Sequence, residues 1–220
     1  MSSRRDTLLA VAADLFVRYG FRRTSVEDMA RAAGVSKGAF YLEFPSKDAL
    51  FEALVRHEVS TYLAAARLRI EADPEGGRLS RIYHHCIAEL LDRDFLRALY
   101  RGDEHVLGGL LQRGGPDRYR PRVLLGGQFL ARLQRAGLVR DAVDPDTLSH
   151  TLSVLTVGPL LAEPLLHADD APPLGATFEA LSAMITTCHE APGGDVEEGR
   201  RAFVELVEAM TAALAEPLPQ

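Results

Sequence analysis

The sequence lacks the features that define several protein classes. Only two of its 220 residues are cysteine, Cys86 and Cys188, which excludes a disulfide framework and suits a reducing, cytoplasmic compartment. The longest apolar run, residues 152–166, is interrupted by Pro159, Glu163 and Pro164 and is shorter than the ~20 residues that span a bilayer. Sustained alternation of apolar and polar residues, the signal for strands, is missing. We therefore expect a helical chain in the cytoplasm with no membrane partner.

Positive charge is also scarce, and it is unevenly distributed. The net charge is −6, which taken alone argues against a polybasic nucleic-acid binder. Residues 1–57, however, hold nine Lys and Arg against seven Asp and Glu, so this segment carries +2 and the remainder −8. The chain has only two lysines, Lys37 and Lys47, and both lie in the basic segment. The sequence thus predicts a mildly basic N-terminal segment on an acidic body.

Apolar residues spaced three and four apart predict helices along nearly the whole chain. Glycine, proline and clusters of small polar residues separate these patterns, as expected of turns and loops. The predicted helices span residues 8–19, 26–33, 36–44, 47–71, 79–93, 95–112, 117–136, 145–167, 175–189 and 196–215. The fold class is therefore all-α, with three N-terminal helices on a larger helical body.

Residues 24–50 contain the most informative pattern. Two short predicted helices are joined by a tight turn at Gly34, which fits a helix-turn-helix, a motif whose second helix enters the DNA major groove. Two capping-box pairs, Thr24 with Glu27 and Ser25 with Asp28, are available to start the first helix. The pattern predicts DNA binding by the second helix; the alternative is a capped surface helix with ordinary charges.

The second helix begins with residues suited to approach a phosphate backbone. Ser36 can cap the helix and offer its hydroxyl to a phosphate, and Lys37 adds a charge that is favourable there only beside an anion. Gly38 and Ala39 are small enough to let the backbone approach a groove, and Tyr41 can place its phenol on a phosphate. These residues are candidate DNA contacts.

Three further positions extend this surface, and two are assigned to the core. Lys47 begins the next helix and repeats the arrangement of a cation at a helix start, while Arg22 and Arg23 flank the same surface. Phe40 and Phe44 are expected to hold the second helix to its neighbours instead of contacting DNA.

Residues 24–41, TSVEDMARAAGVSKGAFY, resemble the helix-turn-helix of the tetracycline-repressor (TetR/AcrR) family. The upstream pattern Phe16-x-x-Tyr19-Gly20-Phe21 and the downstream pattern Tyr41-x-x-Phe44-x-x-Lys47-x-x-Leu50 extend the resemblance to roughly residues 6–55. The resemblance implies an all-α homodimer with a helix-turn-helix DNA-binding domain over residues 1–46 (motif about 25–44). A helical effector-binding and dimerisation domain would follow over residues 47–220, joined by the long helix that starts at residue 47.

The resemblance also assigns roles to individual residues. It implies phosphate contacts for Ser25, Ser36, Lys37, Tyr41 and Lys47, and positions near base edges for Lys37, Gly38, Ala39 and Leu42. Glu43 departs from the pattern, because the family often has a non-acidic residue there. A carboxylate at this position is repelled by phosphate unless it faces away or accepts a hydrogen bond from a cytosine amine.

The body gives less specific signals. The resemblance places dimerisation in its last helices, here residues 145–167 and 196–215, which would form a four-helix bundle across a two-fold axis. Tyr83, Phe95, Tyr100 and Phe129 lie where the family usually has an effector pocket, although each also fits a core position.

Metal and enzyme functions are not expected. His84, His85 and Cys86 suggest a metal site together with Cys188 and His189, but adjacent residues on a helix point about 100° apart and cannot converge on one ion. We expect no cofactor, and no catalytic or nucleotide-binding signature is apparent.

The predicted function is therefore a ligand-responsive repressor. It would bind a near-palindromic DNA operator as a dimer and be released by a small-molecule effector of unknown identity. The alternative is a helical regulator with no such effector that acts through protein partners or as an activator.

Overall fold

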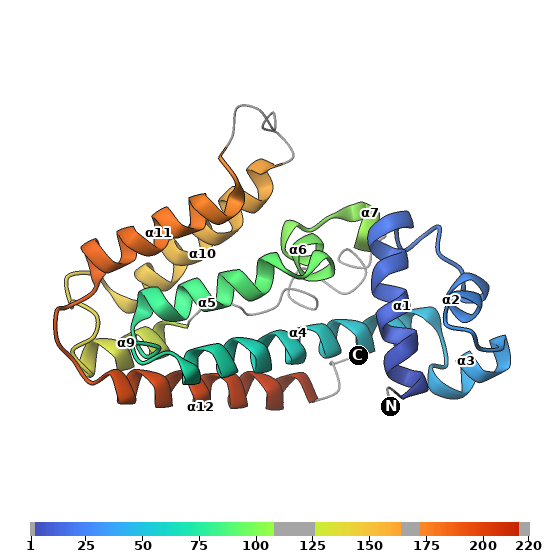
Figure 1. The fold of residues 1–220 in the computed structure, drawn as a ribbon, viewed down its shortest axis with the longest axis horizontal. Coiled ribbons are helices and arrows are strands. Elements are labelled where there is room, and N and C mark those ends of the chain that lie inside the picture. The colour runs from blue at the N-terminus through green and yellow to red at the C-terminus, as the bar shows by residue number, and fades with distance from the viewer. Residues whose placement is uncertain (1–2, 108–125, 164–171, 216–220) are drawn as a thin grey trace. The chain divides into compact units, whose positions relative to one another are not determined.

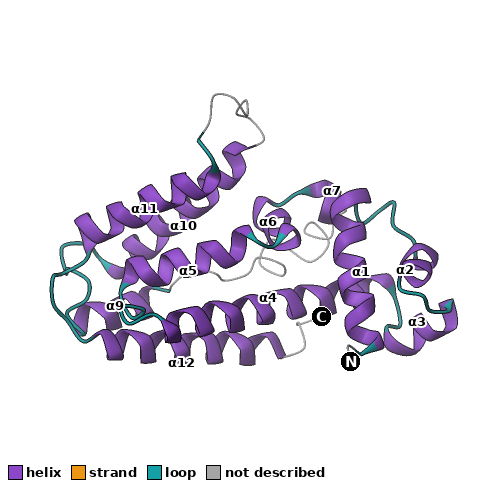
Figure 2. Ribbon diagram, in the orientation of Figure 1, coloured by secondary structure: helices purple, strands orange, loops and turns teal. Residues whose placement is uncertain are grey.

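The computed structural model describes residues 3–107, 126–163 and 172–215, and within these ranges it contains eleven helices and no strand (Figures 1 and 2). The predicted all-α class is confirmed. The helices are α1 (Arg4–Tyr19), α2 (Val26–Ala32), α3 (Lys37–Glu43), α4 (Lys47–Ala72), α5 (Leu79–Leu91), α6 (Asp94–Arg101), α7 (Glu104–Leu107), α9 (Gly127–Arg135), α10 (Pro145–Ala162), α11 (Leu174–His189) and α12 (Val196–Ala215). No helix in the described part is both long enough and apolar enough to cross a membrane.

The chain forms two compact units, and the first includes the N-terminus. Its described part comprises residues 3–61 and 93–107. Here α1 packs against α2, α6 and α7, and α2 packs against α3. The turn between α1 and α2 is tied to α7, because the Phe21 amide donates to the carbonyl of His105 over 3.2 Å. The sequence placed the domain boundary at residue 47, and that boundary stays a prediction.

Aromatic rings fill the core of this first unit. The Phe21 ring lies 5.2 Å from Phe16 and 5.4 Å from Phe51, and Phe51 lies 5.7 Å from Phe95, measured between ring centroids. Rings at these separations add to the area-based stabilisation of a core. The core therefore joins α1, the first turns of α4, and α6.

The second unit includes described residues 62–92, 126–163 and 172–215. In it α5 packs on α11, while α9 packs on both α10 and α12 (Figure 1). Ion pairs cross these helix contacts: Arg132 of α9 lies 2.6 Å from Glu198 of α12, and Arg67 of α4 lies 3.2 Å from Glu208 of α12. The long helix α4 thus contributes residues to both units.

Two details of the sequence prediction are wrong. A single helix over residues 95–112 was expected, but the chain breaks after α6 because Gly102 adopts a left-handed conformation with φ +64°. Thr24 does not cap α2: its side chain is buried and its hydroxyl donates to the Gly20 carbonyl over 2.9 Å. Parts of the predicted helices over 95–112, 117–136 and 145–167 lie outside the described residues.

Candidate nucleic-acid interface

The two helices of the predicted motif are defined by local capping. Ser25 forms a capping box with Asp28, since its Oγ accepts from the Asp28 amide over 3.1 Å and its own amide donates to the Asp28 carboxylate. Gly34 has φ +67° in the turn between the two helices, a left-handed conformation that glycine adopts without steric cost. Ser36 then caps α3 by accepting from the Ala39 amide over 3.1 Å. The predicted helix-turn-helix is therefore formed.

Helix α3 has one buried face and one exposed face. Phe40 is fully buried and Phe44, just after the helix, is 1% exposed, which confirms both as core residues. Away from Phe40, Leu42 is 83% exposed and Tyr41 47%, and Lys37 at the start of the helix is also exposed. An aliphatic side chain as exposed as Leu42 gains nothing from burial within this unit. The exposed face of α3 is therefore available for a partner.

Gly38 lies on the same exposed face. A Cβ added there would meet only its own neighbour Ser36, at 3.8 Å from the hydroxyl oxygen. Its φ lies outside the left-handed region, so alanine would fit without backbone strain. The structure of the unit gives no internal reason for a glycine at this position, whereas close approach by an external partner would give one.

Lys37 is engaged by a residue of the preceding helix. Its ammonium forms an ion pair with the carboxylate of Glu27 in α2, and both side chains are about half exposed. The hydrogen bond from Lys37 lowers the pKa of Glu27, and the same contact raises the pKa of Lys37. Both groups are therefore charged at neutral pH.

Lys47, at the start of α4, makes contacts within the unit. Its ammonium donates to the carbonyls of Phe21 and Thr24 over 2.8 and 3.0 Å and lies 4.1 Å from the Phe21 ring centroid. The side chain thus ties α4 to the connection between α1 and α2. A phosphate contact by Lys47 stays a prediction.

The remaining candidate residues have structural roles as well. The Ser25 and Ser36 hydroxyls cap their helices, and Ser25 is partly buried. Ala39 is also partly buried, next to Phe40. Their contacts with DNA are not tested by this arrangement and stay predictions.

Glu43, the departure noted in the sequence, faces the start of α1. Its carboxylate lies 3.8 Å from the Arg4 guanidinium, and its backbone carbonyl accepts from Arg5 over 3.1 Å. Arg5 also lies 4.3 Å above the Phe44 ring. The carboxylate is thus neutralised by α1, which the sequence analysis did not foresee because the two helices are about 40 residues apart along the chain.

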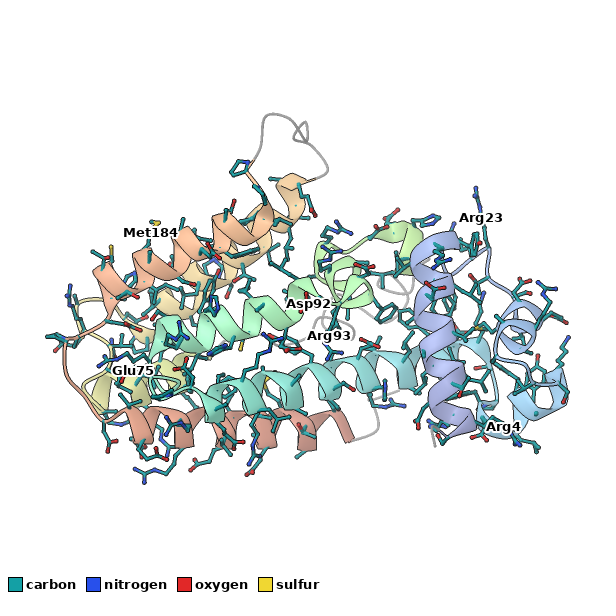
Figure 3. All side chains as sticks on the ribbon, viewed as in Figure 1. Arg4, Arg23, Glu75, Asp92, Arg93 and Met184 are labelled. Atoms are coloured by element: carbon teal, nitrogen blue, oxygen red, sulfur yellow. The ribbon has the colours of Figure 1, made fainter. Side chains whose placement is uncertain are left out.

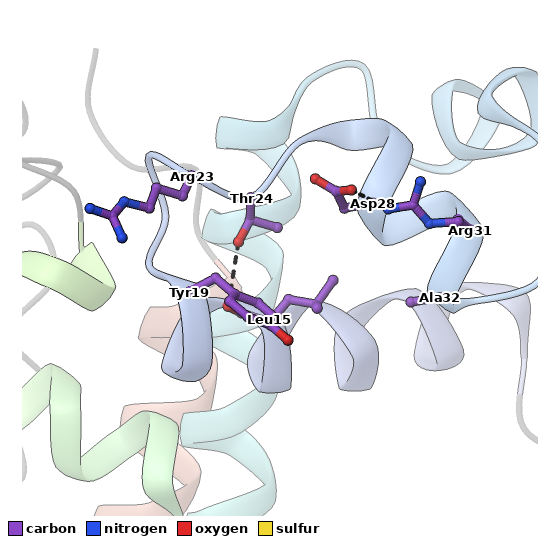
Figure 4. Close-up of a pocket in the computed structure, with 7 residues that line it drawn as sticks. All are labelled: Leu15, Tyr19, Arg23, Thr24, Asp28, Arg31 and Ala32. Atoms are coloured by element: carbon purple, nitrogen blue, oxygen red, sulfur yellow. Dashed lines mark hydrogen bonds and ion pairs between the residues drawn. The ribbon is translucent and has the colours of Figure 1, made fainter.

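A groove of about 410 Å³ opens between α1 and α2 (Figure 4). Its lining includes Leu15 and Tyr19 of α1, and the Thr24 hydroxyl donates to the Leu15 carbonyl over 3.4 Å at its edge. Asp28 is occupied by its ion pair with Arg31 and by its cap with Ser25. None of the four aromatic residues predicted for an effector pocket lines this groove.

Those four aromatic residues are divided between the two units. In the first unit, Phe95 packs against Phe51 as described above, and Tyr100 is partly buried. In the second, the Tyr83 hydroxyl lies 3.2 Å from the Thr156 hydroxyl and the Phe129 ring 6.4 Å from Phe203. Their effector-binding role stays a prediction. The described residues hold no group of three or more His, Cys, Asp or Glu placed to bind a metal ion.

Comparison with known proteins identifies the class of the N-terminal segment. Residues 8–54 match the family model of bacterial regulatory proteins, tetR family. The N-terminal helix-turn-helix is therefore similar to that of the TetR family, and the resemblance seen in the sequence is confirmed over these residues.

Particular relatives match over the same region. The transcriptional regulator RutR of Escherichia coli strain K12 is 39% identical over 64 residues, covering 29% of this chain and 30% of that protein. The transcriptional repressor KstR2 of Rhodococcus jostii is 44% identical over 55 residues, covering 25% and 27%. The matched segment thus spans less than a third of these relatives, and these likenesses in sequence are limited to the helix-turn-helix segment.

Solved structures extend the likeness to the whole fold. The ketosteroid transcriptional regulator KstR2 of Mycobacterium tuberculosis covers 87% of this chain and 97% of its own, with a TM-score of 0.58 at 20% identity. SmeT, the repressor of a multidrug efflux pump of Stenotrophomonas maltophilia, covers 88% and 93%, with a TM-score of 0.58 at 21% identity. At these identities the comparison establishes a shared fold.

Proposed function

We propose that the chain is a DNA-binding transcriptional regulator that acts as a homodimeric repressor. The observation that carries this proposal is the face of α3, where Lys37, Tyr41 and Leu42 are exposed while Phe40 anchors the helix from behind. A rigid helix that presents donors, a small residue and an aliphatic group fits the DNA major groove, where side chains read base edges. The names of the matched relatives, RutR and KstR2, support the same function.

The proposed contacts divide by their chemistry. Ser36 and Tyr41 bind phosphates, and Ser25 adds a hydroxyl at the start of α2. Gly38 and Ala39 let α3 approach the base edges, and Leu42 offers an apolar contact such as a thymine methyl accepts. Lys47 acts by holding the connection between α1 and α2 in place through its two carbonyl contacts.

Two copies of the basic N-terminal segment, residues 1–57 and called the head below, are needed for this function. A head with a net charge of only +2 attracts DNA weakly, so high affinity requires two recognition helices ~34 Å apart in successive major grooves. The sequence predicted the dimer surface in residues 145–167 and 196–215. Val154 and Leu161 of α10 are exposed apolar side chains, which supports the first of these ranges.

The second dimer helix is better supported in α11 than in α12. Met184 of α11, which packs against α10 in the same unit, is 55% exposed. Its side chain projects away from the helices in Figure 3. On the exposed face of α12, Glu205 and Glu208 form ion pairs with Arg132 and Arg67, and the exposed residues that follow, such as Ala212, are small. Burial of apolar side chains drives association, so we propose an interface through α10 and α11.

Release by a small-molecule effector is the further part of the proposal. An effector that binds the helical body more tightly in one state shifts the population toward a head spacing that no longer fits the operator. Tyr83, Phe95, Tyr100 and Phe129 remain the candidates for contact with it.

Selection of bound fragments from a random DNA library by the full-length protein tests this function. We expect enrichment of one near-palindromic sequence, followed by release from it by a compound found in a small-molecule screen. Recovery of no common sequence would contradict the proposal of a specific regulator.

A further inference from the structure

The proposed DNA contacts give no role to the ion pair between Glu27 and Lys37. The two residues are ten positions apart, so the pair bridges α2 and α3 across the turn at Gly34. Glu27 is on the exposed surface of α2, and its carboxylate accepts the hydrogen bond from the Lys37 ammonium. Neither residue is buried, so the core does not require the pair.

The pair changes the charge that α3 presents. Lys37 is the only cation in the sequence of α3, and the helix contains one acidic residue, Glu43. The Glu43 carboxylate is balanced by Arg4 of α1, and the Lys37 ammonium is balanced by Glu27. The exposed face of α3 therefore carries little net positive charge for attraction to phosphate.

This arrangement penalises a complex in which Lys37 binds a phosphate. To make that contact the ammonium must either leave Glu27 or bring the Glu27 carboxylate against the phosphate, and in both cases two anions lie side by side. At a base edge the ammonium can keep its hydrogen bond to Glu27 with one N–H group and donate another to guanine O6 or N7, which carry no formal charge. The second oxygen of the Glu27 carboxylate can accept from the N4 amine of a cytosine.

We propose that Glu27 is a specificity-determining residue, which keeps Lys37 from the phosphate backbone and directs its ammonium to a guanine in the major groove. The operator chemistry that follows is a G·C pair read by each recognition helix. This inference rests on the proposed DNA-binding function and adds to it a residue outside the predicted contacts. The lowered pKa of Glu27 keeps its carboxylate ionised throughout the neutral range.

The test compares Glu27→Gln with a control of equal charge change, Asp14→Asn. Asp14 of α1 also forms an exposed ion pair, with Arg18 over 2.9 Å, and lies outside α2 and α3. Fluorescence anisotropy measures the affinity of each full-length variant for the selected operator and for a scrambled duplex. Library selection with each variant then measures the base preference, which a change in folding alone does not alter.

We expect Glu27→Gln to bind scrambled DNA about fivefold more tightly, since the Lys37 ammonium is released from its ion pair and can bind a phosphate. The freed ammonium adds one phosphate contact, so the slope of log affinity against log salt becomes steeper by ~0.9. Affinity for the operator changes less than about twofold. The ratio of specific to non-specific binding falls, and the selected site loses its preference at one G·C pair per half-site. Asp14→Asn matches the wild type in all three respects.

A double-mutant cycle shows whether Glu27 acts through Lys37. In a Lys37→Ala background, Glu27→Gln has less than about a twofold effect on scrambled DNA, because the ammonium that it controls is gone. An unchanged specificity ratio in Glu27→Gln, or an equal gain in the Lys37→Ala background, would overturn the inference while leaving the proposed function intact. Failure of the wild type to select any sequence would overturn both.

Discussion

Gly38 illustrates how a single residue can indicate a partner. Glycine inside a helix destabilises it by ~1 kcal/mol relative to alanine, and a Cβ at this position would meet no atom closer than 3.8 Å. The free protein would be more stable with alanine. The glycine therefore fits a surface on which the backbone must come close to something outside the chain.

The variant Gly38→Ala is expected to separate stability from binding. Its free energy of unfolding should rise by up to ~1 kcal/mol in urea denaturation, because the helix gains a better former without a clash. Its affinity for the operator should fall, because the methyl group holds α3 away from the base edges. Equal or tighter operator binding by the stabilised variant would contradict close approach at this residue.

Lys47 gives a second prediction at the residue scale. Lys47→Met keeps the aliphatic stem but loses hydrogen bonds to the carbonyls of Phe21 and Thr24, so the free energy of unfolding should fall by ~1.5–3 kcal/mol. Because the ammonium is already engaged within the head, the salt dependence of DNA binding should keep its slope. A slope reduced by ~0.9 would instead identify Lys47 as a phosphate contact, as the resemblance implied.

At the scale of elements, the sequence predicted the first four helices well because their signals are local. Ser25, Gly34 and Ser36 specify caps and a turn within a few residues, so the boundaries of α2 and α3 follow from spacing alone. The break at Gly102 was missed, since the apolar pattern continues across it.

Contacts between elements were not predictable in the same way. The neutralisation of Glu43 by Arg4 and the pairing of Glu27 with Lys37 depend on how helices pack, which spacing does not report. The same holds for the role of Lys47. Sequence thus indicated candidate residues for the site, while the structure shows which of them are already engaged by neighbours.

The junction of α4 and α5 provides a prediction about pH. Asp73 follows α4, and its carboxylate accepts from Arg81 over 2.6 Å and from His85 over 2.8 Å, both in α5. Burial opposes ionisation of Asp73, but the hydrogen bonds from His85 and Arg81 outweigh it and lower its pKa to about 2. The folded state therefore favours the ionised carboxylate, and this stabilisation is present above about pH 4 and is lost as the pH falls toward 2.

Asp73→Asn should accordingly lower the free energy of unfolding at pH 7 by up to ~2 kcal/mol, a figure set by the shift of its pKa. Urea denaturation of variant and wild type between pH 7 and pH 2 measures the effect. The difference should shrink below about pH 4 as the wild-type carboxylate becomes protonated. A difference that is independent of pH would show that the junction depends on packing and not on charge.

At the scale of the whole molecule, substitutions on α11 and on α12 distinguish the two candidate dimer interfaces. Met184→Arg in α11 should shift the protein from dimer to monomer in sedimentation velocity at micromolar concentration, because it places a charge in the proposed apolar interface. Ala212→Arg on the exposed face of α12 should leave the dimer intact. The reverse result would support the interface that the sequence predicted through residues 196–215.

The net charge of the chain is informative only when the N-terminal segment and the remainder are counted separately. A net −6 argues against a nucleic-acid partner, yet it combines a head of +2 with a body of −8. The ion pairs of Lys37 with Glu27 and of Glu43 with Arg4 lie within the head and leave its net charge at only +2. Specific binding should therefore depend on two heads that engage one site together.

The most direct test of this account is an anisotropy titration of the full-length protein at several salt concentrations, on the selected palindrome, on one half-site and on a scrambled duplex. The account predicts tight binding to the palindrome, binding to the half-site weaker by at least about a hundredfold, and still weaker binding to the scrambled duplex, with affinity falling as salt rises. Equal affinity for all three duplexes, or an affinity that does not change with salt, would contradict it.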